Sequence, residues 1–222
     1  LLRKTKNHLN GIFESKYKNE EFWKNFGKNY YEKYEKNKKE WVKEQEILLV
    51  DHLKEYEFDS VLEFGCGYGR LTKVLCENFS IKSYNAFDLV PEQIENAKKY
   101  CKDLDVQFNI SSINDFKSTE KFDLVVGPEI LLHIEPNDIE FVIKKMSSFA
   151  NKFFMATASP YNPDAIIHRG THTFYHNYKK IYDMIGLPPP KIIPVNDINE
   201  IQFISFKLFL FNKLFIFFIV FI

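Results

Sequence analysis

Aromatic residues recur at helical spacing in the first quarter of the chain, with lysines and glutamates between them. These aromatic positions are Phe22, Phe26, Tyr30 and Tyr34. The segment EWVKEQEILLVDHLKEY carries an apolar face onward. Because residues three and four apart share one face of a helix, the pattern predicts amphipathic helices over residues 12–58. We expect their aromatics to pack on a core, and some of them to cover a ligand pocket.

Apolar runs of strand length alternate with helical patterns over residues 59–158. The predicted strands are DSVLEFG, SYNAFDL, DVQFNI, KFDLVVG and KFFMATAS, and the predicted helices are RLTKVLCENF, EQIENAKKYC and PNDIEFVIKKMSSFA. Such alternation is typical of a parallel sheet built from βαβ units. The nearly continuous apolar strands indicate a sheet that is covered on both faces.

The pattern closes with a predicted helix, FYHNYKKIYDMIG, and two further strands, KIIPV and IQFISFKLF. The run LPPP between them cannot be helical. Together these elements predict an α/β fold with a doubly wound, mostly parallel seven-stranded sheet and an N-terminal helical extension. We expect the extension at residues 1–58 to pack on the core, a cofactor-binding domain at 59–207 and a hydrophobic tail at 208–222.

The tail at 208–222 differs in composition from the rest of the chain. It is almost wholly apolar, but Lys213 interrupts it and nine apolar residues follow that lysine. A membrane-spanning helix needs about 20 apolar residues, and a charge near its middle is unfavourable. Three interpretations stay open: a buried or edge strand, a product of frameshifted AT-rich DNA, and a contact with a membrane.

Composition limits the partners and the cellular compartment that we expect for the protein. The chain has 222 residues, with 30 basic and 30 acidic side chains, so no long-range field attracts it to nucleic acid or anionic lipid. Its three cysteines form no close pair, which argues against both a zinc site and a disulfide framework. The start, LLRKTKNHLN, has no apolar run of signal-peptide length, so we expect a cytoplasmic protein. Because the first residue is leucine, we expect the true start upstream or at a non-standard codon.

The stretch SVLEFGCGYGR joins the first predicted strand to three alternating glycines, Gly65, Gly67 and Gly69. A phosphate-binding P-loop requires Lys followed by Ser or Thr after the last glycine, where this chain has Arg70 and Leu71. The dinucleotide fingerprint spaces its glycines as G-x-G-x-x-G, one residue longer than here. The loop therefore favours neither a nucleoside triphosphate nor a dinucleotide.

Two carboxylates define the expected ligand more closely. Glu63 ends the first strand two residues before the first glycine, where it would repel a pyrophosphate but attract an amine. Asp88 ends the second strand, where an acid can accept hydrogen bonds from ribose hydroxyls. S-adenosylmethionine combines an amine, a sulfonium and a ribose without any phosphate. We therefore expect it to be the cofactor.

The segments VLEFGCGYGRLTKVL and AFDLVPEQIENAKKY resemble the class I S-adenosylmethionine-dependent methyltransferases, whose fold is Rossmann-like. The resemblance extends from about Trp41 to Tyr161. It implies that the glycine loop wraps the methionine part of the cofactor, that Asp88 binds both ribose hydroxyls and that Leu89 lies beside the adenine. Ser112 stands where the family often has Asp, which weakens the expected adenine contact. The cofactor-binding residues implied are Glu63, Phe64, Gly65, Cys66, Gly67, Asp88, Leu89, Ser112, Ile113 and Glu129.

The resemblance implies a methyltransferase that acts on a small-molecule or biosynthetic-intermediate acceptor. A non-catalytic cofactor-binding or scaffold module is the alternative, and a dehydrogenase is disfavoured by Glu63 and the glycine spacing. The fourth strand leads into GPEI rather than an N-P-P-Y-like tetrapeptide, so a nucleic-acid partner is not expected.

Histidines supply the remaining candidate chemistry. His133, just after the fourth strand, is the candidate general base, with a packing role as the alternative. His172, His176 and Tyr178 are candidates for the acceptor pocket, because the segment after the fifth strand often builds that pocket in the family. His168, His172 and His176 lie four apart, but no Asp or Glu lies between them, so we expect no metal site.

Overall fold

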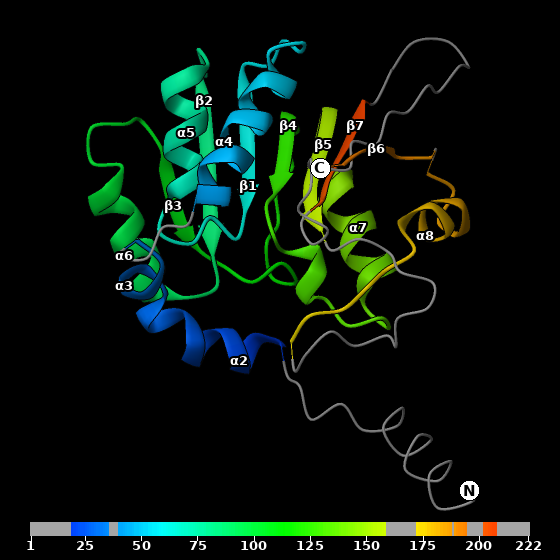
Figure 1. Cartoon of the computed structure of the whole chain (residues 1–222), viewed down its shortest axis with the longest axis horizontal. Helices are drawn as coiled ribbons and strands as arrows, with labels where there is room; N and C mark the ends of the chain where they lie inside the picture. Colours follow the sequence, from blue (N-terminus) through cyan, green and yellow to red (C-terminus); the bar gives the residue numbers. More distant parts are fainter. Residues whose placement is uncertain (1–18, 36–39, 159–171, 188, 195–201, 208–222) are drawn as a thin grey trace, which may run out of the picture.

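The structure is a computed structural model of the whole chain (Figure 1). It describes residues 19–35, 40–158, 172–187, 189–194 and 202–207. The hydrophobic tail at 208–222 and His168 lie outside these residues.

Residues 19–35 and 40–53 are helical, as their periodicity predicts. Helix α2 (Asn19–Phe26), the 3-10 turn η1 (Gly27–Asn29) and helix α3 (Tyr30–Glu35) follow one another directly. We call residues 19–35 the cap. Helix α4 (Glu40–Leu53) leads from there into the first strand. In Figure 1, α2 and α3 lie beyond one end of the sheet, whereas α4 lies alongside it.

Among the described residues, one sheet has the strand order β3-β2-β1-β4-β5-β7-β6. Its strands are β1 (Ser60–Phe64), β2 (Ser83–Asp88), β3 (Gln107–Ile110), β4 (Phe122–Gly127), β5 (Ala150–Ala158), β6 (Lys191–Pro194) and β7 (Gln202–Lys207). The first five pair in parallel, and β7 pairs antiparallel with both β5 and β6. The prediction of a Rossmann-like, mostly parallel sheet is confirmed. The chain order reverses beside β1, so that β2 and β4 flank it, and in open α/β sheets ligands bind at such a point.

Helices cover both faces of the sheet because neighbouring strand residues point to opposite sides. On one face Val61 and Leu124 pack with residues of α4, of α5 (Arg70–Asn78) and of α6 (Pro91–Tyr100). On the other face Leu62 and Val125 pack with residues of α7 (Ile139–Ser148) and α8 (Tyr178–Met184). This is the doubly wound arrangement that continuous apolar strands require.

Two predicted helices begin later than their patterns suggested. Helix α7 starts at Ile139 rather than near Pro136, and α8 starts at Tyr178 rather than Phe174. The side chain of Asn177 caps α8 by accepting a hydrogen bond from the backbone N of Lys180 at 3.1 Å. This capping bond satisfies one of the amides that a helix start leaves unpaired, which explains the later start.

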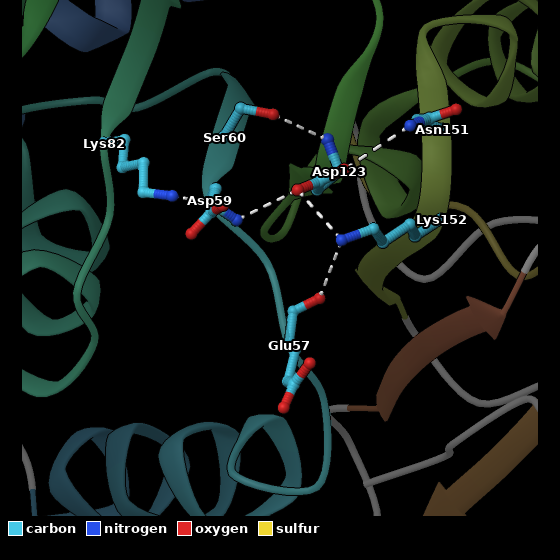
Figure 2. Close-up of polar contacts among 7 residues, drawn as sticks. All are labelled: Glu57, Asp59, Ser60, Lys82, Asp123, Asn151 and Lys152. Carbon is cyan, nitrogen blue, oxygen red and sulfur yellow. Dashed lines mark hydrogen bonds and ion pairs between the residues drawn. The ribbon is translucent and has the colours of Figure 1, made fainter.

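A polar cluster around Asp123 connects the beginnings of β1, β4 and β5 (Figure 2). The Asp123 carboxylate accepts from the backbone N of Asp59 at 3.0 Å and pairs with Lys152 Nζ at 3.1 Å. The backbone N of Asp123 donates to Ser60 Oγ at 2.9 Å. Burial raises the pKa of Asp123, but the hydrogen bonds from the backbone of Asp59 and from Lys152 outweigh it, so the pKa is lowered. Together these bonds connect the strand starts at the end of the sheet opposite the cavity.

No helix in the described part of the chain is long and apolar enough to cross a membrane.

Candidate functional site

A cavity of about 500 Å³ opens at the carboxyl ends of β1, β2 and β4, and the cap covers part of it. Nine of the predicted cofactor residues line it: Glu63, Gly65, Cys66, Gly67, Asp88, Leu89, Ser112, Ile113 and Glu129. Phe64 is fully buried instead, with its ring 4.5 Å from that of Phe87. Phe64 follows Glu63 on the strand, so its side chain points to the other face of the sheet.

The glycine loop brings bare backbone to this cavity. Gly65, Gly67 and Gly69 all have positive φ, which residues with a side chain rarely adopt. A Cβ on Gly65 would lie 2.6 Å from Ile130 Cδ1, whereas a Cβ on Gly67 would meet nothing within 4 Å. A side chain at Gly65 would be strained by its φ of 64° and would displace the end of the Ile130 side chain, while Gly67 leaves open space into which a ligand can approach the backbone.

Asp88 supports the loop and faces the cavity. Its Oδ2 accepts from the backbone N of Gly67 at 2.9 Å, and its Oδ1 accepts from the backbone N of Val90 at 2.8 Å. Burial raises the pKa of Asp88, while these backbone hydrogen bonds lower it. Each oxygen keeps a further lone pair, so the carboxylate can also accept from two ligand hydroxyls.

Glu63 is completely buried. Its Oε2 accepts hydrogen bonds from Thr72 Oγ1 at 2.5 Å and from the Tyr84 hydroxyl at 2.8 Å. Its Oε1 has no hydrogen-bond partner among the described residues. Burial raises the pKa of Glu63 to about 7, despite the two hydroxyls and nearby Arg70, which lower it. The cavity wall thus contains a carboxylate with one oxygen that has no partner. When the group is ionised, this oxygen can accept a hydrogen bond from a cationic donor.

Glu129 connects the cavity to α4 and α5. Its φ of 55° is unusual for a residue with a side chain. Gln45 Nε2 donates to Glu129 Oε1 at 3.0 Å, and Arg70 donates to both Gln45 Oε1 and Glu46 Oε1 at 3.0 Å. The sequence did not single out Arg70, which lines the cavity, because its functional position depends on contacts between three separate elements.

Ser112 is turned toward its own loop. Its hydroxyl donates to Asp115 Oδ2 at 2.8 Å and accepts from the backbone N of Asp115 at 3.1 Å. This short-range pair closes the turn after β3 and presents Ile113 and Asn114 to the cavity. The acid of this loop therefore lies three residues after the position at which the family resemblance implies it, and it bonds Ser112.

The cap adds cavity-lining residues that the sequence did not assign: Asn19, Glu20, Trp23, Gly27 and Tyr30. Asn19 Nδ2 donates to the backbone O of His133 at 2.9 Å, and Gln93 Nε2 donates to the backbone O of Gly27 at 2.7 Å. The expectation that some N-terminal aromatics cover a pocket is met by Trp23 and Tyr30. The four-residue spacing predicted a helix face, but only the contacts show which face covers the cavity.

Comparison with known proteins agrees with this geometry. A family described as "Methyltransferase domain" matches residues 61–152. This part of the chain is therefore similar to known methyltransferase domains. Among curated relatives, a ubiquinone biosynthesis O-methyltransferase of Pelagibacter ubique is 33% identical over 102 residues, covering 44% of this chain and 41% of that protein. A malonyl-[acyl-carrier protein] O-methyltransferase of Acetivibrio thermocellus is 30% identical over 97 residues, covering 41% and 34%. The chain thus aligns with less than half the length of each.

Solved structures show the same fold at low sequence identity. An S-adenosylmethionine-dependent methyltransferase from Clostridium acetobutylicum superposes with a TM-score of 0.62 at 17% identity, covering 81% of this chain and 96% of that one. The N-methyltransferase NodS from Bradyrhizobium japonicum, in complex with S-adenosyl-l-homocysteine, also has a TM-score of 0.62, at 18% identity, covering 77% and 88%.

His133 lines the cavity at the end of turn η2 (Leu131–His133). Its Nδ1 lies 2.6 Å from the backbone O of His172, and Trp23 packs edge-on against its ring at 4.6 Å. Burial lowers the pKa of His133 to about 4, so the ring is neutral near pH 7. Because a carbonyl accepts only, the proton lies on Nδ1, and Nε2 is the nitrogen with a lone pair.

The other predicted pocket residues do not line this cavity. His172 stacks on Phe22 of the cap, with ring centroids 4.6 Å apart. His176 is buried, and its Nε2 lies 2.9 Å from the backbone O of Ile134. Tyr178 is fully buried at the start of α8, and its hydroxyl has no hydrogen-bond partner among the described residues. Burial of this segment against η2 directs these side chains into the core or against the cap.

Over the described ranges, no group of three His, Cys, Asp or Glu side chains is placed to hold a metal ion.

Proposed function

We propose that this protein is an S-adenosylmethionine-dependent methyltransferase that acts on a small-molecule or biosynthetic-intermediate acceptor. One observation carries the proposal: the cavity at the reversal of strand order combines the open backbone at Gly67, the buried Glu63 and the carboxylate of Asp88. These three groups match the methionine part, the amine and the ribose of the cofactor, respectively. Of the alternatives, a scaffold module that binds no cofactor would have no need for a buried carboxylate with an unpaired oxygen, whereas a non-catalytic cofactor-binding module is tested by methyl transfer.

Each of these residues has a role in holding the cofactor. Glu63 Oε1 would accept from its α-amino group, the backbone at Gly67 would contact its methionine part, and Asp88 would accept from its ribose hydroxyls. Leu89 and Ile113 would enclose the adenine. When bound, S-adenosylmethionine supplies a methyl group on a sulfonium, which leaves as a neutral thioether. The protein therefore has to supply position and exclude water more than it has to activate a leaving group.

We propose that His133 orients the acceptor as a neutral hydrogen-bond acceptor. Its lowered pKa keeps Nε2 unprotonated at neutral pH, and the contact with His172 maintains that tautomer. A hydroxyl whose proton points to Nε2 directs an oxygen lone pair away from the histidine. Proton removal then accompanies attack, which matters for a hydroxyl acceptor and much less for a carboxylate.

The charge of the cavity wall favours a neutral or cationic acceptor. Three acids that have no assigned part in cofactor binding line it, namely Glu20, Glu135 and Asp138, and the one lysine or arginine among the described lining residues, Arg70, contacts Glu46. A carboxylate acceptor would be repelled by this wall. The relative named for malonyl-[acyl-carrier protein] therefore differs from this chain in the acceptor we propose, and a hydroxyl or an amine fits better.

We further propose that residues 59–207 form the methyltransferase domain, that residues 1–58 extend it with a cap, and that the protein acts in the cytoplasm without a nucleic-acid partner. The two hydrogen bonds that Asn19 and Gln93 make between the cap and the domain support this division.

The test is calorimetric titration of S-adenosylmethionine, with NAD as the control ligand. We expect S-adenosylmethionine alone to bind. Asp88→Ala should lose affinity by about tenfold or more while remaining folded, because it removes an acceptor of two hydroxyl hydrogen bonds. Asp103→Ala, which removes an exposed acid elsewhere, is the matched control. Binding of NAD instead, or equal affinity in both variants, would contradict the proposal. Formation of S-adenosylhomocysteine with hydroxyl and amine acceptors then tests transfer.

A further inference from the structure

Tyr68 is the largest side chain of the glycine loop at residues 65–69, where it lies between Gly67 and Gly69. Both glycines have positive φ. Because glycine has no Cβ, many other backbone conformations are open to it, so the loop is ordered by whatever holds its one large side chain. Only 4% of Tyr68 is exposed, and Tyr68 also lines the cavity. The neighbours that bury its ring therefore help to set the shape of the loop.

Two rings from different elements pack edge-on against Tyr68. Tyr100, the last residue of α6, has its centroid 5.4 Å away at an interplanar angle of 86°, and Lys73 Nζ from α5 lies 4.9 Å from the centroid of Tyr100. Tyr31, in α3 of the cap, has its centroid 5.0 Å from that of Tyr68 at 70°. Figure 1 shows α3 beside α6, as this cluster requires. Edge-on pairs at these separations are stabilising beyond the area that they bury.

The first helix of the cap is held to the rest of the chain without burying any of its residues. It is attached by the hydrogen bond from Asn19 to η2 and by ring contacts such as that between Phe22 and His172. A segment with few buried apolar contacts opens at a low free-energy cost. A single aromatic pair therefore matters for the position of the cap. The pair formed by Tyr31 and Tyr68 connects the cap to the glycine loop itself.

We propose that Tyr31 is a positioning residue for the cofactor, and that it acts through Tyr68 to hold the glycine loop in its binding conformation. This inference rests on the proposed function, in which the backbone at Gly67 contacts the methionine part of the cofactor. Tyr31 itself is not among the described residues that line the cavity. Packing of the cap on Tyr68 preorganises the loop and so strengthens cofactor binding. By linkage, a bound cofactor strengthens the attachment of the cap by the same factor.

The first measurement is the affinity for S-adenosylhomocysteine by calorimetry. The proteins are the wild type, Tyr31→Ala, Tyr31→Phe and the control Tyr56→Ala, which removes a ring packed on Phe153 at 4.8 Å, shortly before β1 at the opposite end of the sheet. Tyr31→Ala should bind about threefold to tenfold more weakly. Tyr31→Phe keeps the ring and should bind as the wild type does. Tyr56→Ala should have a lower Tm but an unchanged affinity.

A double-mutant cycle tests whether Tyr31 acts through Tyr68. In a Tyr68→Ala background, Tyr31→Ala should cause little further loss of affinity, because the ring through which it acts is already absent. Equal losses in both backgrounds would show that the cap affects the cofactor by another route, and would overturn the inference.

Hydrogen exchange of the amides in residues 19–35 supplies a readout that a merely structural role would not change. Saturating S-adenosylhomocysteine should slow this exchange more in the wild type and Tyr31→Phe than in Tyr31→Ala. Equal slowing in all three proteins, unchanged affinity of Tyr31→Ala, or the same loss of affinity in Tyr31→Phe or Tyr56→Ala would overturn the inference and leave the proposed function intact. Failure of the wild type to bind S-adenosylhomocysteine would instead contradict the proposed function itself.

Discussion

Replacing Glu63 with glutamine should make the unliganded protein more stable at alkaline pH. In the folded chain burial raises the pKa of Glu63 from 4.5 to about 7. A raised pKa means that the folded state binds the proton more tightly than the unfolded state does. The stability that this proton contributes is fully present below pH 4.5 and is lost as pH rises through about 7.

The size of this change in unfolding free energy follows from the difference between the folded and unfolded pKa values. The rise from 4.5 to about 7, at about 1.36 kcal/mol for each pH unit, corresponds to about 3 kcal/mol of unfolding free energy. Most of this stability is lost between about pH 5 and pH 8, because that interval contains the folded-state pKa of about 7. The neutral amide of the Glu63→Gln variant carries no charge at any pH, so that loss should disappear. Its carbonyl oxygen can still accept from Thr72 and Tyr84.

The assay is urea unfolding of the wild type, Glu63→Gln and the control Glu92→Gln at pH 5 and pH 8, without cofactor. Glu92 is exposed at the start of α6. We expect the wild type and the control to lose about 2 to 3 kcal/mol more unfolding free energy than Glu63→Gln over this interval. Equal pH dependence in all three proteins would refute the idea that Glu63 is protonated in the folded, unliganded state.

Three further changes test other parts of the argument. Asp123→Ala should lower the unfolding free energy at pH 7 by about 1 kcal/mol, since it removes acceptors for the backbone of Asp59 and for Lys152. Because the pKa of Asp123 is lowered in the folded chain, the difference from the wild type should shrink at acid pH, and equal urea midpoints at pH 7 would contradict this prediction. Gly67→Ala should fold, with a small fall in Tm from its φ of 54°, but should bind S-adenosylmethionine about tenfold or more weakly in calorimetry, because its new methyl group would occupy open cavity space. His133→Asn should lower kcat for a hydroxyl acceptor by about tenfold or more while leaving cofactor affinity unchanged, and an unchanged kcat would show that the ring only packs.

Much of the cavity wall was predictable because it is local in the chain. A strand that ends in Glu63 and turns at Gly65 places a carboxylate and bare backbone at the same edge of a parallel sheet. Asp88 at the end of the next strand must reach that edge too, since parallel strands end on the same side. Phe64 was misassigned for a related reason, because alternation along a strand sends neighbouring side chains to opposite faces.

The acceptor side was less predictable because it depends on segments far apart in the chain. The segment around His176 resembles part of a pocket in sequence, yet it packs under η2 with His176 facing the backbone of Ile134. The spacing of the histidines in the sequence does not predict which of them contacts a backbone carbonyl and which lines a cavity.

Local patterns in the chain were enough to predict the sheet, its two covered faces and the carboxylates at the strand ends, because apolar periodicity and glycine conformation act over a few residues. Three features emerged only from the packed fold: the cap covers the cavity, burial raises the pKa of Glu63 to about 7, and Gln93 keeps an unpaired oxygen. Burial, pKa and hydrogen-bond satisfaction are properties of the packed neighbours of a group, and those neighbours come from distant parts of the chain.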